Sequence, residues 1–242
     1  MKLPVLFSLI LLSVIKISAQ VSSPPSVESA FQNYLQAQSG NVYTGSGLPT
    51  FLIKEDTKGS SYLFEKWVNG SVVGTNGVVY DSPKLLFNYN KMNQKLFMLL
   101  DSNRVMELSS ADIAGFNLKD GGTEYHFERL KNSTDLNFYQ PVYKEEKGYS
   151  LYKLLTTKFK KADYQTNGIV ESGNKFDEYV DEEKYFILTP KQELIKMDFK
   201  KKSIEKALEA ESVKVKSYFS QHKDQDVNEE FVTGLLQFIN SK

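Results

Sequence analysis

The sequence predicts an α+β fold that is mainly β, an antiparallel β meander followed by a C-terminal helical hairpin. From residue 43 to about residue 198, β-branched and aromatic residues alternate with polar ones in short runs between Gly, Asn, Asp and Lys clusters. Such period-two alternation is typical of strands with one buried face. After residue 198 the apolar residues recur at helical spacing. The expected organisation is a signal peptide (1–19), a tether with a short helical segment (20–40), an antiparallel β domain (41–200) and a helical pair packed on it (201–242).

The first residues have the order of a secretory signal peptide. Lys2 precedes an apolar run that ends at Ile15, and the small residues Ser18 and Ala19 close the segment. The run is shorter than the roughly 20 residues that a helix needs to cross a bilayer, so no integral membrane segment is expected after cleavage. A lipoprotein anchor and a disulfide both require cysteine, and the sequence has none. We therefore expect a periplasmic or secreted protein that is not a lipoprotein and has no disulfide.

Residues 20–29 are rich in Ser and Pro, a composition typical of a tether. Phe31, Tyr34 and Leu35 follow at helical spacing and predict one or two helical turns. This segment leads into the first strands near residue 43.

The stretch WVNGSVVGTNGVVYDSPKLLFNYN, residues 67–90, contains the strongest hairpin signal of the chain. Asn76 and Gly77 stand between two β-prone runs, and both central positions of a two-residue hairpin turn need a positive φ, which Asn and Gly tolerate. A break is expected at residues 81–83, and a second strand at residues 85–89.

Later runs of the same kind predict further strands, which begin near residues 95, 104, 124, 138, 150, 175 and 183. Thr189 and Pro190 predict one more hairpin turn near the end of the β domain. Several of the connections are too short for a parallel crossover, so neighbouring strands are expected to be antiparallel. About ten strands result, and a sheet of that size forms a curled sheet, a sandwich or a partly open barrel. The sequence leaves these three forms open.

Three apolar stripes at helical spacing follow: Ile204, Ala207 and Leu208; Val215, Tyr218 and Phe219; and Phe231, Leu235, Phe238 and Ile239. Asp226 and Glu229 resemble a capping box at the start of the last helix. Helices this short are marginal in water and depend on packing an apolar face. We therefore expect them to pack on the β domain.

The charge balance predicts neither nucleic acid nor an anionic membrane as a partner. The chain has 30 basic and 30 acidic residues. Loss of Lys2 and Lys16 with the signal peptide leaves 28 basic against 30 acidic residues, a net charge of −2. Binding of polyanions usually requires a marked basic excess.

No catalytic residue, metal site or cofactor is predicted. His126 and His222 are the only histidines, and neither has a partner at metal-ligand spacing. His126 is expected on the solvent face of its strand. Paired carboxylates can bind calcium or hydrolyse glycosides, but the acidic run lacks the spacing of a calcium loop. We interpret it as a solvated turn between two strands; it comprises Asp177, Glu178, Asp181, Glu182 and Glu183.

A series of Gly, Tyr and Trp motifs spans the mature chain. It comprises Tyr43-Thr44-Gly45, Gly59-Ser60-Ser61-Tyr62-Leu63-Phe64, Trp67, Gly70-Ser71-Val72, Asn76-Gly77, Tyr80, Leu86-Phe87-Asn88-Tyr89-Asn90, Phe127-Glu128-Arg129-Leu130, Phe138-Tyr139 and Tyr143. In order and spacing these motifs resemble a family of exported Bacteroidota proteins of unknown function. Ser61 stands where that family has proline, and Asn90 where it has aspartate, so an acidic role at position 90 does not carry over. The resemblance implies the fold and the compartment and brings no activity with it.

The expected function is that of a non-enzymatic exported protein that binds another envelope protein or gives structural support. Four aromatic residues are candidates for a binding surface: Trp67, Tyr62, Tyr80 and Tyr89. Aromatic residues in strands are more often core or cross-strand partners than exposed ligands for sugars or peptides. Two alternatives stay open: a carrier of an apolar ligand in a half-open β-barrel, lined by a face such as residues 96–100, and a hydrolase that uses scattered carboxylates. The oligomeric state also stays open.

Overall fold

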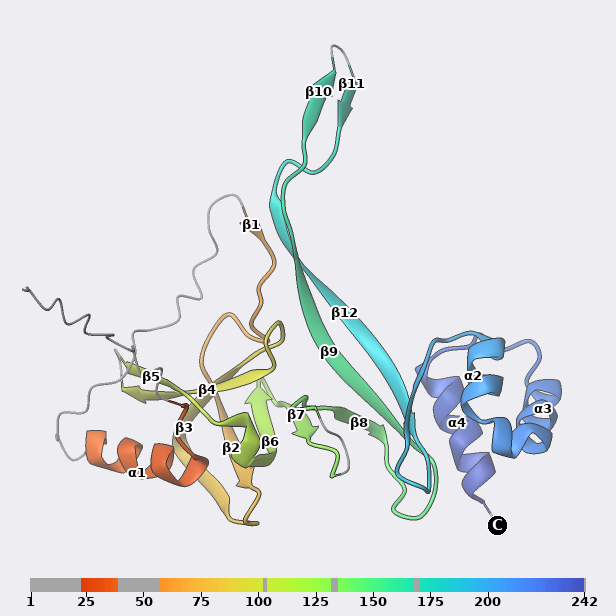
Figure 1. Cartoon of the computed structure of the whole chain (residues 1–242), viewed down its shortest axis with the longest axis horizontal. Coiled ribbons are helices and arrows are strands. Elements are labelled where there is room, and N and C mark those ends of the chain that lie inside the picture. Colours follow the sequence, from red (N-terminus) through yellow and green to blue (C-terminus); the bar gives the residue numbers. More distant parts are fainter. Residues whose placement is uncertain (1–22, 39–56, 102–103, 132–134, 168–169, 242) are drawn as a thin grey trace, which may run out of the picture.

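The structure is a computed structural model, and it describes residues 23–38, 57–101, 104–131, 135–167 and 170–241. These residues form thirteen strands in three sheets and four α-helices. The prediction of an α+β fold that is mainly β is confirmed. Figure 1 shows a sheet with helix α1 at one end, the C-terminal helices at the other, and a long hairpin rising between them. The predicted signal peptide lies outside the described residues.

The first sheet has six strands in the order β5, β4, β3, β2, β6, β7, and every pair is antiparallel. Their bounds are β2 Val68–Gly74, β3 Val79–Asn90, β4 Lys95–Asp101, β5 Arg104–Glu107, β6 Ile113–Asp120 and β7 Thr123–Glu128. A short 3-10 turn, η1 (Ser110–Asp112), connects β5 with β6. The hairpin between β2 and β3 is confirmed, because Val73 faces Val79. The predicted two-residue turn is wrong: the Gly77 N–H donates to the Gly74 carbonyl, and of Asn76 and Gly77 only Gly77 has a positive φ, +81°.

Strand β3 continues through residues 81–83, so the predicted break is wrong. The register of β3 shifts between Asn69 and Ser71 of β2, and residues 82–85 bulge out of the ladder there. The Asn69 side-chain amide donates to the carbonyl of Pro83 at 2.7 Å. A bulge accommodates proline, because a residue outside the ladder needs no backbone N–H.

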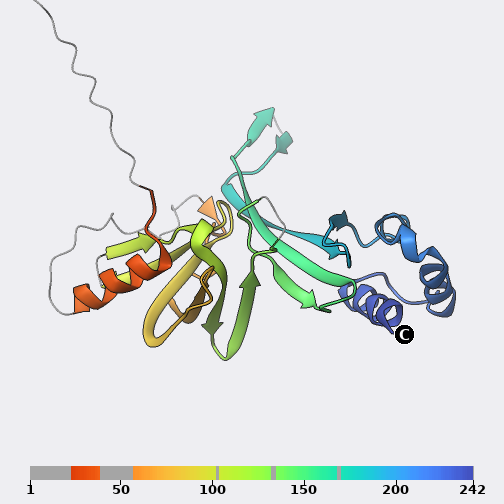
Figure 2. The ribbon, with the colours of Figure 1, turned by 60° about the horizontal axis from the view of Figure 1, so that its bottom comes forward.

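Aromatic side chains fill the interior of the first sheet, which curls in Figure 2. The ring centroids of Tyr89, Phe116, Phe127 and Phe138 lie 4.8 to 6.2 Å apart. Each of these residues is at most 1% exposed. Burial of one such ring contributes on the order of 1.5–3 kcal/mol, so this cluster is a major source of stability.

Helix α1 (Val27–Gln38) packs on the first sheet and is longer than the one or two turns predicted. Its buried residues Val27, Ala30 and Tyr34 recur at helical spacing. The carbonyl of Pro25 accepts a hydrogen bond from the backbone N–H of Ser109. The prediction of a tether across residues 20–29 is therefore wrong from Pro25 onward.

The second sheet is built around two long antiparallel strands, β9 (Ser150–Lys160) and β12 (Asp177–Leu188). Three short strands add to its edges: β8 (Gln140–Tyr143) beside β9, β13 (Leu194–Met197) beside β12, and β1 (Thr57–Lys58) parallel to the start of β12. A two-stranded sheet, β10 (Gln165–Asn167) and β11 (Val170–Ser172), extends beyond them. The turn predicted at Thr189 and Pro190 is confirmed, and Gln192 adopts a φ of +66° in it.

The acidic run lies inside β12, so its interpretation as a turn between two strands is wrong. Lysines on neighbouring elements neutralise parts of it: the Nζ of Lys158 lies 2.6 Å from a carboxylate oxygen of Glu182, and the Nζ of Lys91 lies 2.6 Å from one of Asp181. Cross-strand pairs of opposite charge stabilise a sheet. Because these partners are distant in sequence, the run alone gives no sign of them.

Three α-helices follow β13, where the sequence predicted a helical pair. They are α2 (Lys201–Ala207), α3 (Ser212–Gln221) and α4 (Glu229–Asn240), with a 3-10 turn, η2 (Glu209–Glu211), between the first two. The side chain of Asn228 caps α4 by accepting from the Phe231 N–H at 2.9 Å. The prediction of a capping box with Asp226 is therefore wrong.

The C-terminal helices pack on the base of the second sheet. Leu235 and Val232 of α4 share a buried cluster with Leu151 of β9 and Ile187 of β12. The first sheet and α1 form a separate buried cluster. The β region thus contributes to one core at each end of the molecule (Figure 1), and a smaller third cluster contains Tyr139, Tyr152 and Leu154. Among the described helices, none is long and apolar enough to cross a membrane.

Candidate functional site: a projecting two-stranded arm

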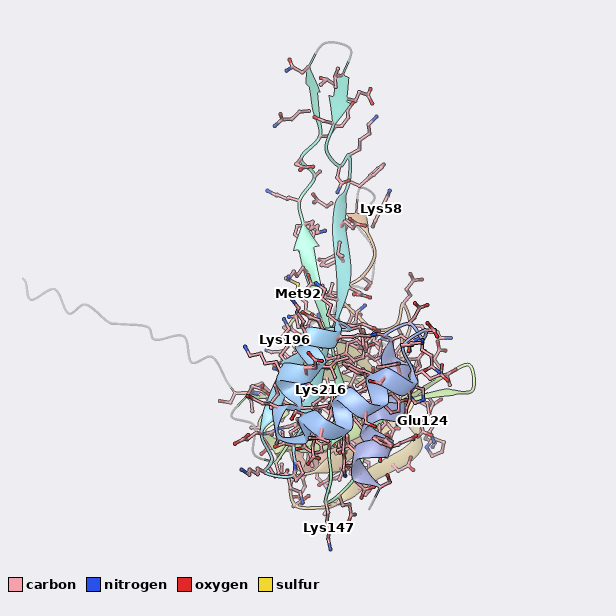
Figure 3. All side chains as sticks on the ribbon, turned by 90° about the vertical axis from the view of Figure 1, so that its right-hand side faces the viewer. Lys58, Met92, Glu124, Lys147, Lys196 and Lys216 are labelled. Carbon is pink, nitrogen blue, oxygen red and sulfur yellow. The ribbon has the colours of Figure 1, made fainter. Side chains whose placement is uncertain are left out.

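The distal halves of β9 and β12, together with β10 and β11, project from the rest of the molecule. We call residues 156–167 and 170–182 the arm. In Figure 3 the arm stands clear of both ends of the molecule, with Lys58 beside it and Met92 near its base. Thr157 is the only buried residue among the described residues of the arm. The arm therefore has no hydrophobic core of its own.

Aromatic and apolar side chains are exposed along the arm. Phe159 and Phe176 are each 41% exposed, and Val170 at the tip is 67% exposed. The rings of Phe159 and Tyr179 face each other across the two strands, with centroids 5.0 Å apart. Large aromatic residues dominate the energy of many protein interfaces, so this exposed set is the strongest interaction feature of the described residues.

Lysine side chains lie over two of the arm's rings. The Nζ of Lys58 lies 4.6 Å from the ring centroid of Phe176, and the Nζ of Lys175 lies at the same distance from that of Tyr164. Such cation–π contacts contribute about 0.5–1 kcal/mol each at exposed sites. They order the rings without covering them.

A nearly buried lysine fixes the base of the arm to the first sheet. The Nζ of Lys91, in the turn after β3, lies 2.7 and 2.6 Å from the two carboxylate oxygens of Asp181. Thr157 donates to the same carboxylate at 2.5 Å. The Lys91 side chain is only 7% exposed, whereas the Asp181 side chain is 59% exposed. Since a buried cation needs a partner, this contact fixes the base of the arm against the first sheet.

Gln94 makes a second contact between the first sheet and the base of the arm. Its side-chain amide donates to the carbonyl of Leu155 at 2.8 Å, and its oxygen accepts from the Tyr89 hydroxyl at 2.6 Å. Gln94 adopts a φ of +59°, which is uncommon for a residue other than glycine. Burial raises the pKa of Tyr89, so its hydroxyl keeps its proton and stays a donor.

Strand β1 reaches the arm through Gly59, which directly follows it. A Cβ at Gly59 would lie 2.6 Å from the carbonyl oxygen of Tyr179, and Gly59 has a φ of +73°. Both the close approach and the positive φ favour glycine. The chain therefore crosses this edge of β12 at one defined point.

The four sequence candidates lie at different places. Tyr62 is half buried and pairs through an isolated bridge with Asn90, and burial raises the pKa of its phenol. Tyr89 is fully buried, and Tyr80 is buried with its ring 5.4 Å from that of Phe31 in α1. The interpretation of Tyr80 and Tyr89 as surface residues is therefore wrong, because both point into the first core. Trp67 is half buried just before β2. Of the four candidates, Tyr89 and Tyr62 lie near the base of the arm, because Tyr89 bonds to Gln94 and Tyr62 pairs with Asn90.

The sequence analysis missed Phe159 and Phe176. The available signal was the length of the two strands, eleven and twelve residues, with charged residues on both faces. Strands in globular proteins are usually about 5–6 residues long. A strand that continues past its apolar residues predicts a projecting ribbon.

A polar cluster around Glu128 joins the two sheets. Lys144 and the Tyr152 hydroxyl donate to its carboxylate at 2.6 and 2.7 Å. His126 is exposed, as predicted, and lies 3.4 Å from the same carboxylate, with its Nδ1 2.5 Å from the Asn117 side-chain oxygen. Burial opposes ionisation of Glu128, but hydrogen bonds from Lys144 and Tyr152 outweigh it and lower the pKa of the carboxyl. These contacts are typical of a structural tie between β7 and β9.

A pair of carboxylates, Glu183 and Glu229, connects the C-terminal helices to β12. The Tyr185 hydroxyl lies 2.8 Å from an oxygen of Glu183 and 2.7 Å from one of Glu229. Because both oxygens contact one hydroxyl, the two carboxylates lie close enough together to be compared with the catalytic pair of a retaining glycoside hydrolase, whose carboxyl groups are about 5–5.5 Å apart. However, the Nζ of Lys153 lies 3.4 and 3.7 Å from the same two carboxylates, which are 49% and 42% exposed. Neutralised and solvated carboxylates of this kind fit a surface tie better than a catalytic pair. Within the described residues, no group of three or more His, Cys, Asp and Glu side chains is arranged to bind a metal ion.

The face of β4 that was predicted to line a cavity for an apolar ligand, residues 96–100, is covered by the protein's own side chains. Leu96, Met98 and Leu100 are buried, and they belong to the same cluster as Val27 and Ala30 of α1. Side chains thus fill the space where a carrier would hold its ligand.

No protein-family model matches the chain, and no curated protein or solved structure matches it significantly. The arm is therefore the feature of the described residues that bears on function.

Proposed function

We propose that this chain is an exported, non-enzymatic protein that binds another protein through the arm. The observation that carries the proposal is a long ribbon with one buried residue and with Phe159, Phe176 and Val170 exposed to solvent. A two-stranded ribbon is marginally stable in water without a third strand or a packed face. A partner that covers the arm would supply that missing packing.

The order of the leader supports the export part of the proposal. Lys2, the apolar run to Ile15 and the small residues at Ser18 and Ala19 have the composition that the export machinery recognises. Mass spectrometry of the mature protein is the test. A mature chain that starts at Gln20 or Val21 supports export, and one that still begins at Met1 contradicts it.

Photo-crosslinking tests the binding part of the proposal. A benzophenone amino acid replaces Phe159 or Phe176 in the full chain, and in control variants it replaces Lys147 or Lys216, which are exposed and lie away from the arm (Figure 3). We expect a defined protein adduct from the arm positions alone. Equal adducts from the control positions, or none from the arm, would contradict the proposal.

A shortened arm gives the matched loss-of-function variant. Lys160 and Glu178 face each other directly, so an Asn-Gly turn can join them in place of residues 161–177. The described residues removed include no buried side chain, so the melting temperature should change by no more than about 2–4 °C, the equivalent of roughly 1 kcal/mol. The shortened chain should fold and should compete more weakly for the arm-specific adduct, because it keeps Phe159 but lacks Phe176 and Val170.

A further inference from the structure

One edge of the arm is open along β9. On its other edge, β9 pairs with β12 over its whole length. On the open side, β8 pairs only with residues 151–153, and the side chain of Gln94 occupies the carbonyl of Leu155. No strand among the described residues pairs with this edge beyond Lys153.

The backbone groups on this edge point outward in a predictable order. The carbonyl of Leu155 points away from β12, since it accepts from Gln94 in the first sheet. Outward and inward positions alternate along an antiparallel ladder. Phe159, four residues further on, therefore directs its N–H and C=O groups toward the open edge. On the far side of the arm, β1 already adds a third strand at Asp177 and Glu178, so at this level of the arm the β9 edge is the one without a third strand.

The side chains beside this edge specify what an added strand would need. Lys158 and Lys160 lie on one face of β9 and are both exposed. Phe159 lies on the opposite face, beside the ring of Tyr179. A neighbouring strand meets these two faces alternately. The complementary strand has carboxylates opposite the lysines and apolar side chains opposite Phe159.

We propose that the open edge of β9 binds an extended segment of the partner protein in which acidic and apolar side chains alternate. This inference rests on the proposed function of the arm and specifies its binding mode, the addition of a β-strand to an exposed sheet edge. The ion pair between Lys158 and Glu182 is 60% and 34% exposed, and such exposed pairs contribute little, so Lys158 remains available to a second carboxylate. A second copy of this chain is disfavoured as the occupant, because pairing β9 with β9 of another copy would place lysines opposite lysines.

A synthetic peptide in which glutamate and valine alternate is the probe, titrated onto the full chain by fluorescence anisotropy. We expect it to bind at least about tenfold more tightly than the same peptide with lysine in place of glutamate, a difference of 1.4 kcal/mol. Lys160→Glu should weaken binding by a similar factor and improve binding of the lysine peptide. Lys147→Glu, a charge reversal far from the arm (Figure 3), should change neither affinity.

Hydrogen exchange at the Phe159 amide separates strand addition from simple charge attraction. The bound peptide should slow exchange of this amide, because its N–H gains a partner. Phe159→Pro removes that N–H and should abolish binding, whereas Phe159→Leu keeps it and should retain most of the affinity. Unchanged exchange of the β12 amides in Phe159→Pro shows that the arm is still formed. Peptide binding that leaves the Phe159 amide unprotected, or equal affinity for both peptides, overturns strand addition.

The two proposals fail in different ways. Arm-specific photo-adducts without protection of the Phe159 amide would leave the arm as a binding element and refute the open edge as its site. Loss of both the adducts and peptide binding would refute both proposals.

Discussion

Strands β3 and β12 each have twelve residues, yet they do different things for the molecule. Strand β3 lies between two neighbours and buries six of its residues, among them Leu85, Phe87 and Tyr89. Strand β12 buries only two, Tyr185 and Ile187, both near its C-terminal end. Burial of apolar area is the main stabilising term in folding. Strand β3 therefore stabilises the fold along most of its length, whereas the first half of β12 extends beyond any core.

The largest expected effect is removal of the packing that β12 does have. Leu235 of α4 is fully buried beside Ile187, so Leu235→Ala should cost about 2–5 kcal/mol in unfolding free energy. Phe238 is only half buried, so Phe238→Ala should cost less. Deletion of residues 201–242 should expose the base of the second sheet and cause aggregation. Urea denaturation followed by circular dichroism measures each change, and a truncated chain of unchanged stability contradicts the role given to the helices.

One matched pair of substitutions tests the comparison directly. Phe127 is fully buried in the first sheet, whereas Phe159 is 41% exposed on the arm. Phe127→Ala should therefore lower the free energy of unfolding by about 3–5 kcal/mol. Phe159→Ala should change it by no more than about 0.5 kcal/mol, as is usual for surface positions. Similar losses in the two variants would show that the arm is a structural element after all.

The elements that the sequence predicted correctly depend on local chemistry. The place of the β2–β3 hairpin follows from the Asn76-Gly77 pair, although only Gly77 of the two has a positive φ, +81°. The C-terminal stripes follow from helical periodicity, and their members Ile204, Val215 and Leu235 are all fully buried. In each case a few adjacent residues contain all the information that the prediction needs.

The features that the sequence did not predict depend on partners that are distant along the chain. The acidic run resembles a solvated turn because its partners, Lys91 and Lys158, lie on other elements that are distant in sequence. Alternation likewise gives no sign of which face of β3 turns inward, so it does not distinguish Tyr89, which is fully buried, from a surface residue. The one local sign of the arm is the length of β9 and β12, which continue beyond their buried apolar residues. That length predicts a projecting ribbon but does not show which of its edges is open.

A smaller effect on stability is expected at the contact between the turn after β3 and strand β12, where Lys91 pairs with Asp181. Asp181→Ala should cost about 1–3 kcal/mol, because it leaves the nearly buried ammonium group of Lys91 without its carboxylate. Lys91→Met should cost less than about 1 kcal/mol, because the apolar stem stays packed and Asp181, which is 59% exposed, can be solvated. Equal losses in urea denaturation would contradict this asymmetry and indicate that both charges are equally solvated.

The smallest expected effect is a pH dependence of the unfolding free energy that comes from Glu128, which joins β7 to β9. Hydrogen bonds from Lys144 and Tyr152 lower the pKa of Glu128 below its ordinary value of 4.5, although burial opposes them. A lowered folded-state pKa contributes stability that is present above about pH 4.5 and is lost as the pH falls through the folded pKa. Glu128→Gln should therefore be less stable than the native chain near neutral pH, and the difference should shrink toward zero under acid conditions. Glu124→Gln is the matched control on the same strand, because the Glu124 carboxylate is 53% exposed and 3.7 Å from Lys119, and its difference should stay near zero throughout. A Glu128→Gln difference that does not change with pH, measured by thermal melts, would show that the side chain acts by packing and not by charge.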